Sequence, residues 1–150
     1  MKKDAYFLGL ALKEAKKSLR RGDYPAGCVI VQRGKIVSKA SSAGITKKDA
    51  TAHAELQAIQ RACRKLKSRF LKECTAYCSV EPCLMCAKAV VYARLPKVVF
   101  GAPHGEYGKQ KTFSILFKIG VGKGLNIVEG IEKEQSERLL KLFYSRKITI

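Results

Sequence analysis

Apolar and polar positions along the chain recur with two different periods, and each period predicts one kind of element. Near the start, apolar residues recur at helical spacing: Leu8, Leu12, Ala15 and Leu19. This spacing predicts an amphipathic helix over residues 4–21. Gly22 follows, and glycine readily adopts the left-handed conformation that ends helices. We therefore interpret this segment as a helix of the folded protein and not as a cleaved leader.

Shorter apolar runs predict strands. Residues 26–32 and 35–39 indicate two strands joined in a hairpin at Arg33 and Gly34. The other predicted elements follow in order: a helix at 52–66, a strand at 74–80, a helix that opens at Pro82, a strand at 97–101, a strand at 125–129 and a helix at 131–144. Two strands followed by alternating helices and strands predict an α/β fold, with one sheet covered by helices on both faces.

Length and cysteine content narrow the class of protein. At 150 residues, 47% of them hydrophobic, the chain can form one domain over residues 1–150. Disulfide frameworks belong mainly to shorter secreted chains, and no apolar run reaches the roughly 20 residues of a membrane span. We therefore expect a cytoplasmic protein in a reducing compartment. Four of its six cysteines are expected to be small buried residues: Cys28, Cys63, Cys74 and Cys78.

The charge balance is strongly basic. Lys and Arg number 30 against 12 Asp and Glu, which gives a net charge of +18. Such a surface attracts polyanions, so nucleic acid is the first partner to consider, although a generally solvated basic surface is the alternative. Residues 61–72 carry six positive charges and no acid. The residues expected to contact a nucleic-acid backbone are Arg64, Lys65, Lys67, Arg69, Lys109 and Lys111.

Two short motifs carry candidate chemistry. Cys83 and Cys86 follow Pro82 at the predicted start of a helix, where the helix dipole and unpaired N–H groups favour the metal-binding thiolate. Alone, this pair could equally be a redox pair or two buried residues. His53 stands at the start of another predicted helix and can supply a third ligand. Three protein ligands leave one zinc position open, as in catalytic sites, and Glu55 is placed to handle protons there.

H53-A-E55 followed by P82-C-L-M-C86 resembles the signature of the zinc nucleobase deaminases. The similarity covers nearly the whole chain and is greatest to the bacterial tRNA adenosine deaminases, through Y24-P-A-G-C-V-I-V31, R94-L-P-K-V-V-F-G-A102 and the end of the chain. It implies a three-layer cytidine-deaminase-like fold, with a five-stranded mixed sheet and helices on both faces. It also implies a homodimer. Residues 87–95 are apolar on more than one face, which suits a partner chain or an internal core equally.

The resemblance implies the reaction. One zinc ion per chain, held by His53, Cys83 and Cys86, would make a water molecule acidic enough to react near neutral pH. Glu55 would take the water proton and return it to the ring nitrogen and then to the leaving amine. The leading expectation is a hydrolytic deaminase that converts adenosine to inosine in tRNA.

The substrate residues depart from the family at two places. Pro103 and His104 stand where the tRNA-type enzymes carry arginine and aspartate in a loop that contacts the nucleotide. Ser42 stands where these enzymes carry an asparagine that binds the target base, although a shifted loop would put Ser41 there instead. Conversion of cytosine to uracil in tRNA or single-stranded DNA is therefore an alternative reaction. Serine offers one hydroxyl in place of the paired donor and acceptor of an amide. The full set expected around the substrate is Pro25, Ala26, Ser42, Ala54, Glu81, Pro82, His104 and Tyr107. His104 and Tyr107 are equally compatible with ordinary loop residues.

The sequence is also compatible with two other functions. A deaminase of free bases or nucleosides, such as guanine or cytosine, is one, because residues 58–66 also resemble bacterial guanine deaminases. The salt dependence of substrate affinity separates it from a nucleic-acid enzyme, since only contacts to a phosphate backbone make affinity fall steeply with salt. The other is a non-catalytic zinc protein that binds RNA. Glu55 argues against it, because a purely structural zinc site has no use for that carboxylate.

Overall fold

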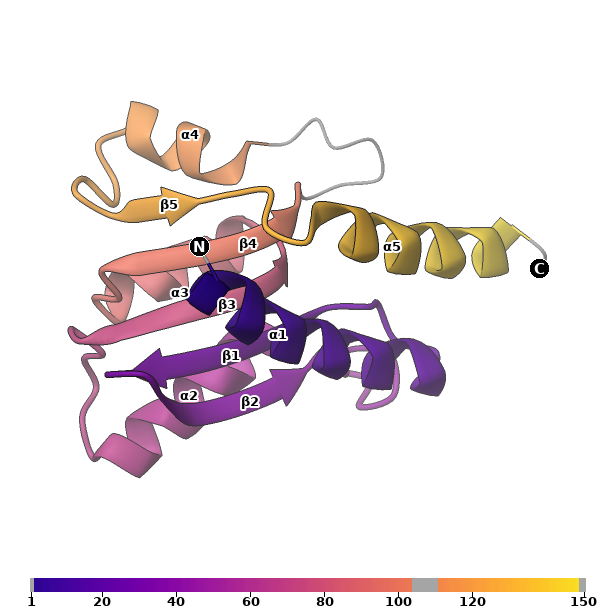
Figure 1. Ribbon diagram of the computed structural model, residues 1–150, viewed down its shortest axis with the longest axis horizontal. Coiled ribbons are helices and arrows are strands. Elements are labelled where there is room, and N and C mark those ends of the chain that lie inside the picture. The colour runs from indigo at the N-terminus through magenta and orange to yellow at the C-terminus, as the bar shows by residue number, and fades with distance from the viewer. Residues whose placement is uncertain (1, 104–110, 149–150) are drawn as a thin grey trace.

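The computed structural model describes residues 2–103 and 111–148 and centres on one mixed sheet. Its strands are β1 (Gly27–Gln32), β2 (Lys35–Ser41), β3 (Cys74–Val80), β4 (Lys97–Ala102) and β5 (Asn126–Val128). Their order across the sheet is β2-β1-β3-β4-β5 (Figure 1). β1 runs antiparallel to β2 and β3, whereas β3, β4 and β5 are parallel. The prediction of a five-stranded mixed sheet is confirmed.

Five helices in the described residues cover the two faces of this sheet. They are α1 (Lys2–Arg21), α2 (Ala54–Leu66), α3 (Leu84–Tyr92), α4 (Thr112–Lys118) and α5 (Lys133–Ile148). α1 and α5 lie on one face and α2 and α3 on the other, with α4 packed against α3 (Figure 1). In the described part of the chain, no helix combines the length and apolar character needed to cross a membrane.

α1 forms where the helical spacing predicted it. Its four periodic residues Leu8, Leu12, Ala15 and Leu19 are all buried. The helix ends at Arg21, and Gly22 follows with a φ of +88°. Gly27 at the start of β1 lets the helix approach closely, because a Cβ there would clash with the carbonyl oxygen of Ala11. This close packing fixes the middle of α1 beside the start of β1.

The first hairpin also follows its turn chemistry. Arg33 and Gly34 both have positive φ, 49° and 76°. This is the pattern of a type I′ turn, whose twist matches that of the flanking strands. The alternation along β1 then divides its side chains between two cores. Val29 and Val31 face α1, whereas Cys28 and Ile30 face the larger core under α2 and α3.

Several other helix and strand ends are shifted by one to four residues from the prediction, and two further features differ from it. The helix expected to open at Pro82 begins at Leu84, because Cys83 is still extended, with φ −67° and ψ 173°. α4 was not predicted. It is held by packing of Phe113 against Phe100, with ring centroids 6.3 Å apart.

All six cysteines are free thiols. Of the four expected to be buried, Cys28, Cys74 and Cys78 are buried and Cys63 is half-buried.

Candidate zinc site and adjoining cavity

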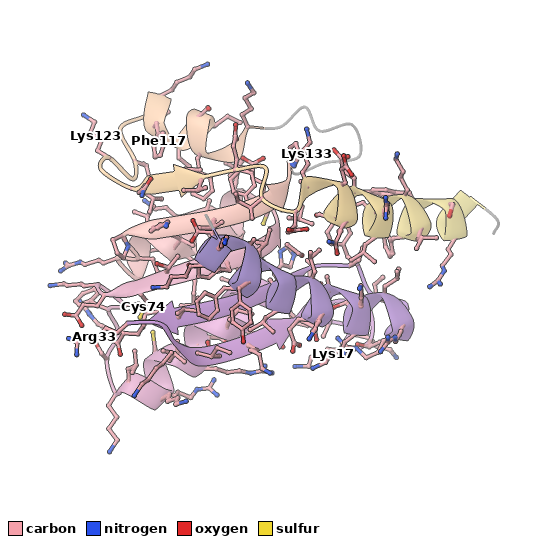
Figure 2. All side chains as sticks on the ribbon, in the orientation of Figure 1. Lys17, Arg33, Cys74, Phe117, Lys123 and Lys133 are labelled. Atoms are coloured by element: carbon pink, nitrogen blue, oxygen red, sulfur yellow. The ribbon has the colours of Figure 1, made fainter. Side chains whose placement is uncertain are left out.

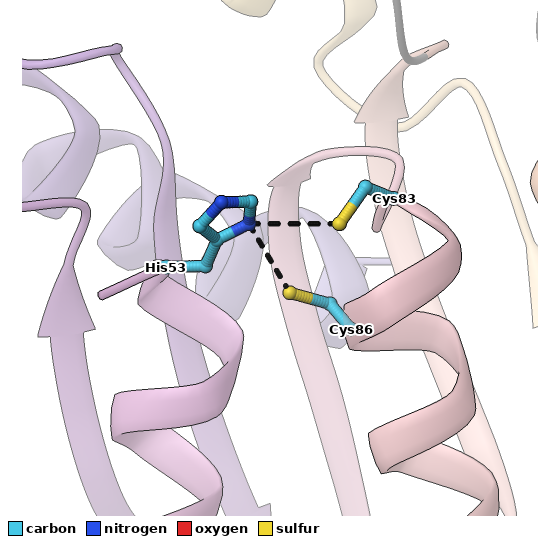
Figure 3. A group of neighbouring side chains, drawn as sticks. All are labelled: His53, Cys83 and Cys86. Carbon is cyan, nitrogen blue, oxygen red and sulfur yellow. Dashed lines mark hydrogen bonds between the residues drawn. The ribbon is translucent and has the colours of Figure 1, made fainter. Parts of the chain in front are cut away.

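Two helices of the same face begin immediately after a candidate metal ligand. His53 precedes α2 and Cys83 precedes α3, and both residues have extended backbone conformations at the N-cap position. Neither side chain caps its own helix. Instead both turn toward the gap between the helix starts, where Cys86 from the first turn of α3 joins them (Figure 3). The fold therefore brings together three residues that lie up to 33 positions apart in the sequence.

The ligand atoms have the spacing that a small tetrahedral ion requires. Nδ1 of His53 lies 3.5 Å from Sγ of Cys83 and 3.4 Å from Sγ of Cys86. All three atoms lie within 4.8 Å of one another. Zinc bonds of about 2.3 Å to sulfur and about 2.0 Å to nitrogen place neighbouring ligands roughly 3.6 Å apart. One imidazole and two thiols at this spacing fit zinc.

Protons are shared unequally among these side chains. A hydrogen bond from the Cys86 thiol lowers the pKa of Cys83 to about 3, and His53 adds to this, although burial opposes it. The same hydrogen bond, with burial and Glu55, raises the pKa of Cys86 strongly. The hydrogen bond with Cys83 also raises the pKa of His53. One sulfur is therefore ready to bind a metal, whereas the other holds a proton that a metal must displace.

Glu55 lies in the first turn of α2, next to these ligands, and is only 5% exposed. Burial raises the pKa of its carboxyl, with a further contribution from Cys83. Hydrogen bonds from its own backbone N–H and from Cys86 act in the opposite direction. A buried carboxyl with a raised pKa is suited to accept and release a proton near neutral pH.

A cavity of about 220 Å³ opens beside Glu55. It is lined by Tyr24, Ala26, Ser42, His53, Ala54, Glu55, Val80, Glu81 and Cys83. Four residues expected around the substrate are among them: Ala26, Ser42, Ala54 and Glu81. Pro25 and Pro82 are fully buried and do not line the cavity. His104, Tyr107 and Lys109 lie outside the described residues.

Ser42, and not Ser41, is the serine at the cavity. Arg21 Nη2 donates to Ser41 Oγ at 2.9 Å, which directs that hydroxyl to the end of α1. The backbone of Ser42 is held by Ala26, Ser18 and Arg21. Its Oγ makes no hydrogen bond to any residue in the described part of the chain, so this hydroxyl is available to a ligand.

The sequence reasoning missed two residues of the wall, Tyr24 and Val80. Tyr24 packs edge-on against Phe143 of α5, with centroids 5.4 Å apart. Its Oη is buried and lies near the phenol of Tyr144. Burial, with Tyr144 nearby, raises the pKa of this phenol, so it stays neutral. Adjacency to Pro25 and Ala26 was the available signal for Tyr24. Val80 could have been found as the last residue of β3.

The basic residues expected to contact nucleic acid lie in different places. Arg64, Lys65 and Lys67 are exposed at the C-terminal end of α2. The 13 residues of this helix put them roughly 20 Å from the cavity end. The Arg69 guanidinium stacks on the Phe70 ring, 4.4 Å from its centroid.

Other cations lie nearer the cavity. Lys111 is exposed beside Thr112, whose backbone N–H donates to Glu81 Oε2 at 3.1 Å. Lys47 Nζ donates to Gln57, one turn into α2. Elsewhere, basic side chains such as Lys17, Arg33, Lys123 and Lys133 project from the periphery (Figure 2).

Comparison with known proteins identifies relatives of the whole site. The model of the cytidine and deoxycytidylate deaminase zinc-binding region matches residues 1–102. A tRNA-specific adenosine deaminase of Aquifex aeolicus (strain VF5) is 46% identical over 114 residues, which are 74% of each chain. A solved structure from a study of A-to-I editing by tRNA:A34 deaminases has a TM-score of 0.81 and 29% identity, covering 90% of this chain and 99% of that one. The guanine deaminase of Bacillus subtilis is 36% identical with a TM-score of 0.65, covering 75% and 73%.

Proposed function

Because this chain belongs to the cytidine and deoxycytidylate deaminase zinc-binding family, we propose that it converts adenosine to inosine in tRNA. The observation that carries the proposal is the juxtaposition of a three-ligand group, a buried glutamate and a cavity at one end of α2. The names of the tRNA adenosine deaminase relatives support the choice of polymer and base. We also propose that residues 1–150 act as one domain in the cytoplasm, where tRNA is modified.

His53, Cys83 and Cys86 would hold zinc in this reaction. When bound, zinc supplies Lewis-acid chemistry that makes water reactive near neutral pH. Glu55 receives one proton of the attacking water and delivers it to the ring nitrogen, and it then transfers the proton of the new C6 hydroxyl to the departing amine. Water adds at C6 of adenine and the C6–N bond breaks, so adenosine and water give inosine and ammonia.

The cavity walls would select the base. Ala26 and Ala54 are small and leave room for a planar ring, while Ser42 offers its free hydroxyl. Serine can donate or accept only at one point, so base choice rests on fewer contacts than an amide would give. This keeps cytosine in tRNA or single-stranded DNA as a variant of the proposal. The 36% identity to a guanine deaminase makes a free purine the second candidate.

The polymer would be held by positive charge. A net charge of +18 favours a phosphate backbone and offers little benefit to an enzyme of free bases. Lys111 is placed near the cavity, whereas Arg64, Lys65, Lys67 and Arg69 would touch parts of the tRNA farther from the target base.

We further propose a homodimer formed through α3. Its outward face exposes three large apolar side chains, with exposed fractions of 47% for Leu84, 38% for Met85 and 71% for Tyr92. Apolar residues grouped on an exposed helix mark interaction surfaces. Sedimentation of the wild type should give a dimer, and Tyr92→Glu should shift it toward monomer; a monomeric wild type would contradict this assignment.

The test of the proposed reaction is a product analysis. The zinc-loaded protein and its Glu55→Ala variant are incubated with unmodified tRNA, single-stranded DNA, free adenine, guanine and cytosine. The polymers are then digested and each deaminated product is quantified by mass spectrometry. Inosine in tRNA that depends on Glu55 is the expected result. An increase in uridine in the tRNA, or deoxyuridine in the DNA, would identify cytosine as the target base. Xanthine from free guanine alone would favour the second candidate.

A further inference from the structure

The loop between β2 and α2 carries Ser42, and the end of α1 holds this loop. We infer that Asp23, with Arg21, is a positioning residue that fixes Ser42 at the cavity wall and so sets how strongly the substrate binds. The inference rests on the proposed function, since it assigns Ser42 to substrate recognition. Its structural basis is a set of hydrogen bonds between two segments more than 20 residues apart.

Asp23 connects α1 to the far side of the loop. Its side chain is 1% exposed, and its backbone N–H donates to the carbonyl of Ser18 at 2.9 Å. Oδ1 accepts from the backbone N–H groups of Ile45 and Thr46 at 2.9 and 3.0 Å. Oδ2 accepts from Thr46 Oγ1 at 2.8 Å. The buried carboxylate thus accepts hydrogen bonds from two loop N–H groups that have no backbone acceptor in the described part of the chain.

Arg21 extends the same connection to Ser42. Its Nε donates to Asp23 Oδ2 at 3.4 Å, which orients the guanidinium. Nη2 then donates to Ser41 Oγ and to the carbonyl oxygen of Ser42, both at 2.9 Å. Ser18 Oγ donates to the same carbonyl, also at 2.9 Å. These hydrogen bonds fix the backbone of Ser42 and do not involve its hydroxyl, which is left for a ligand.

Asp23 is ionised at neutral pH and its hydrogen bonds are charge-assisted. Burial alone would raise the pKa of its carboxyl, but hydrogen bonds from Thr46, Arg21 and Ile45 outweigh burial and hold the pKa below its ordinary value. Charge-assisted hydrogen bonds are roughly twice as strong as neutral ones. Asparagine in place of Asp23 keeps the shape and loses the charge and one acceptor.

The His53 end of the loop has its own anchors. Ala43 N–H donates to the carbonyl of Ala52 at 3.0 Å, and Asp49 accepts from Thr51 N–H and Thr51 Oγ1. Asp23 makes none of these contacts. Loosening the Asp23 contacts should therefore disturb substrate binding at Ser42 and leave the zinc ligands and Glu55 in place.

A double-mutant cycle tests the assignment. Asp23→Asn should raise KM roughly tenfold and leave kcat within about twofold, because the weakened hydrogen bonds position the loop for substrate binding and do not contact the reacting groups. In the Ser42→Ala background the same change should raise KM by less than about threefold, since Ser42 carries the effect. An equal rise in both backgrounds, or a fall in kcat alone, would overturn the inference.

Asp4→Asn is the matched control. Asp4 is a partly buried acid near the other end of α1 and accepts a hydrogen bond from Tyr77 Oη at 2.9 Å. Its replacement should leave KM unchanged. This control separates the effect of a general loss of stability from the effect of a displaced Ser42 loop. If Asp23→Asn fails to fold, Thr46→Val removes one partner hydroxyl and should raise KM by a smaller factor. No rise with Thr46→Val would count against the inference.

Hydrogen exchange separates this inference from the proposed function. Amide exchange at Ile45 and Thr46 should accelerate at least about tenfold in Asp23→Asn whatever the substrate, because their acceptor is weakened. Unchanged exchange there would overturn the positioning role even if the wild type makes inosine. Absence of inosine with the wild type would overturn the proposed function, and the exchange result would still decide the role of Asp23.

Discussion

The two ends of α2 carry different kinds of residue. At its N-terminal end, His53 and Glu55 are held beside Cys83 and Cys86 at distances of a few ångströms. At its C-terminal end, Arg64 and Lys65 are exposed to solvent. In the proposed function, the chemistry that depends on position lies at the helix start, where extended N-cap residues and burial fix each atom. The charge that would attract a polymer at longer range lies at the last turn, where a precise position is not needed.

The largest effect should come from removing a zinc ligand. Cys86→Ser should reduce bound zinc from one per chain to a small fraction, because Cys86 is fully buried and the change removes one of the three candidate ligands found among the described residues. Turnover should fall to the limit of detection and the protein should unfold at a lower temperature. Metal analysis and thermal denaturation measure both effects. Cys63→Ser, a half-buried thiol outside the site, is the control, and full activity without zinc would contradict the assignment.

Glu55→Gln tests chemistry separately from metal binding. The amide keeps the volume of the buried side chain but cannot carry a proton, so kcat should fall about 10³-fold or more. Zinc content and tRNA affinity should stay near the wild-type values. A variant that retains turnover would contradict the proton-transfer role, whereas loss of zinc would make Glu55 a metal ligand.

Ser42→Ala should have an intermediate effect at the same end of the molecule. Loss of the free hydroxyl should raise KM roughly tenfold with little change in kcat, because the group contacts substrate and not the reacting water. Ser41→Ala is the matched control and should raise KM by a smaller factor, since its hydroxyl contacts Arg21 and not the cavity. Equal effects of the two changes would remove Ser42 from the cavity wall as a recognition residue.

The smallest effect should come from the other end of α2. Neutralising Arg64, Lys65 and Lys67 together with Gln should weaken tRNA binding several-fold and reduce the salt slope by about one unit for each lost phosphate contact. Neutralising Lys118, Lys123 and Lys133 removes the same formal charge elsewhere and is the control. Identical losses in the two sets would mean that only net charge matters and not its location.

Local patterns predicted the fold well where one rule determined the structure. The boundaries of β3 follow from its apolar run, and the end of α1 follows from Gly22. α4 could not be predicted, because Thr112–Lys118 is short and apolar on several sides and depends on Phe100 for packing. The start of α3 was placed two residues early, because proline is favoured at a first helical position, yet here Cys83 stays extended to reach His53.

The grouping of His53, Cys83 and Cys86 could be predicted because the two motifs resemble a known family signature. The cavity wall could be predicted only in part, since its members come from segments that meet through the tertiary fold. Tyr24 faces the cavity because α5 packs behind it, and Asp23 meets Thr46 because α1 ends beside the loop. The periodicity of the sequence does not indicate these tertiary contacts.

The most direct test of the difference between the two ends is the rate of inosine formation in tRNA under single-turnover conditions with saturating enzyme. Saturation removes differences in binding, so only position-dependent chemistry remains. We expect the variant neutralised at Arg64, Lys65 and Lys67 to react at the wild-type rate and Glu55→Gln to form almost no inosine. A slow neutralised variant, or an active Glu55→Gln, would contradict this difference between the two ends of α2.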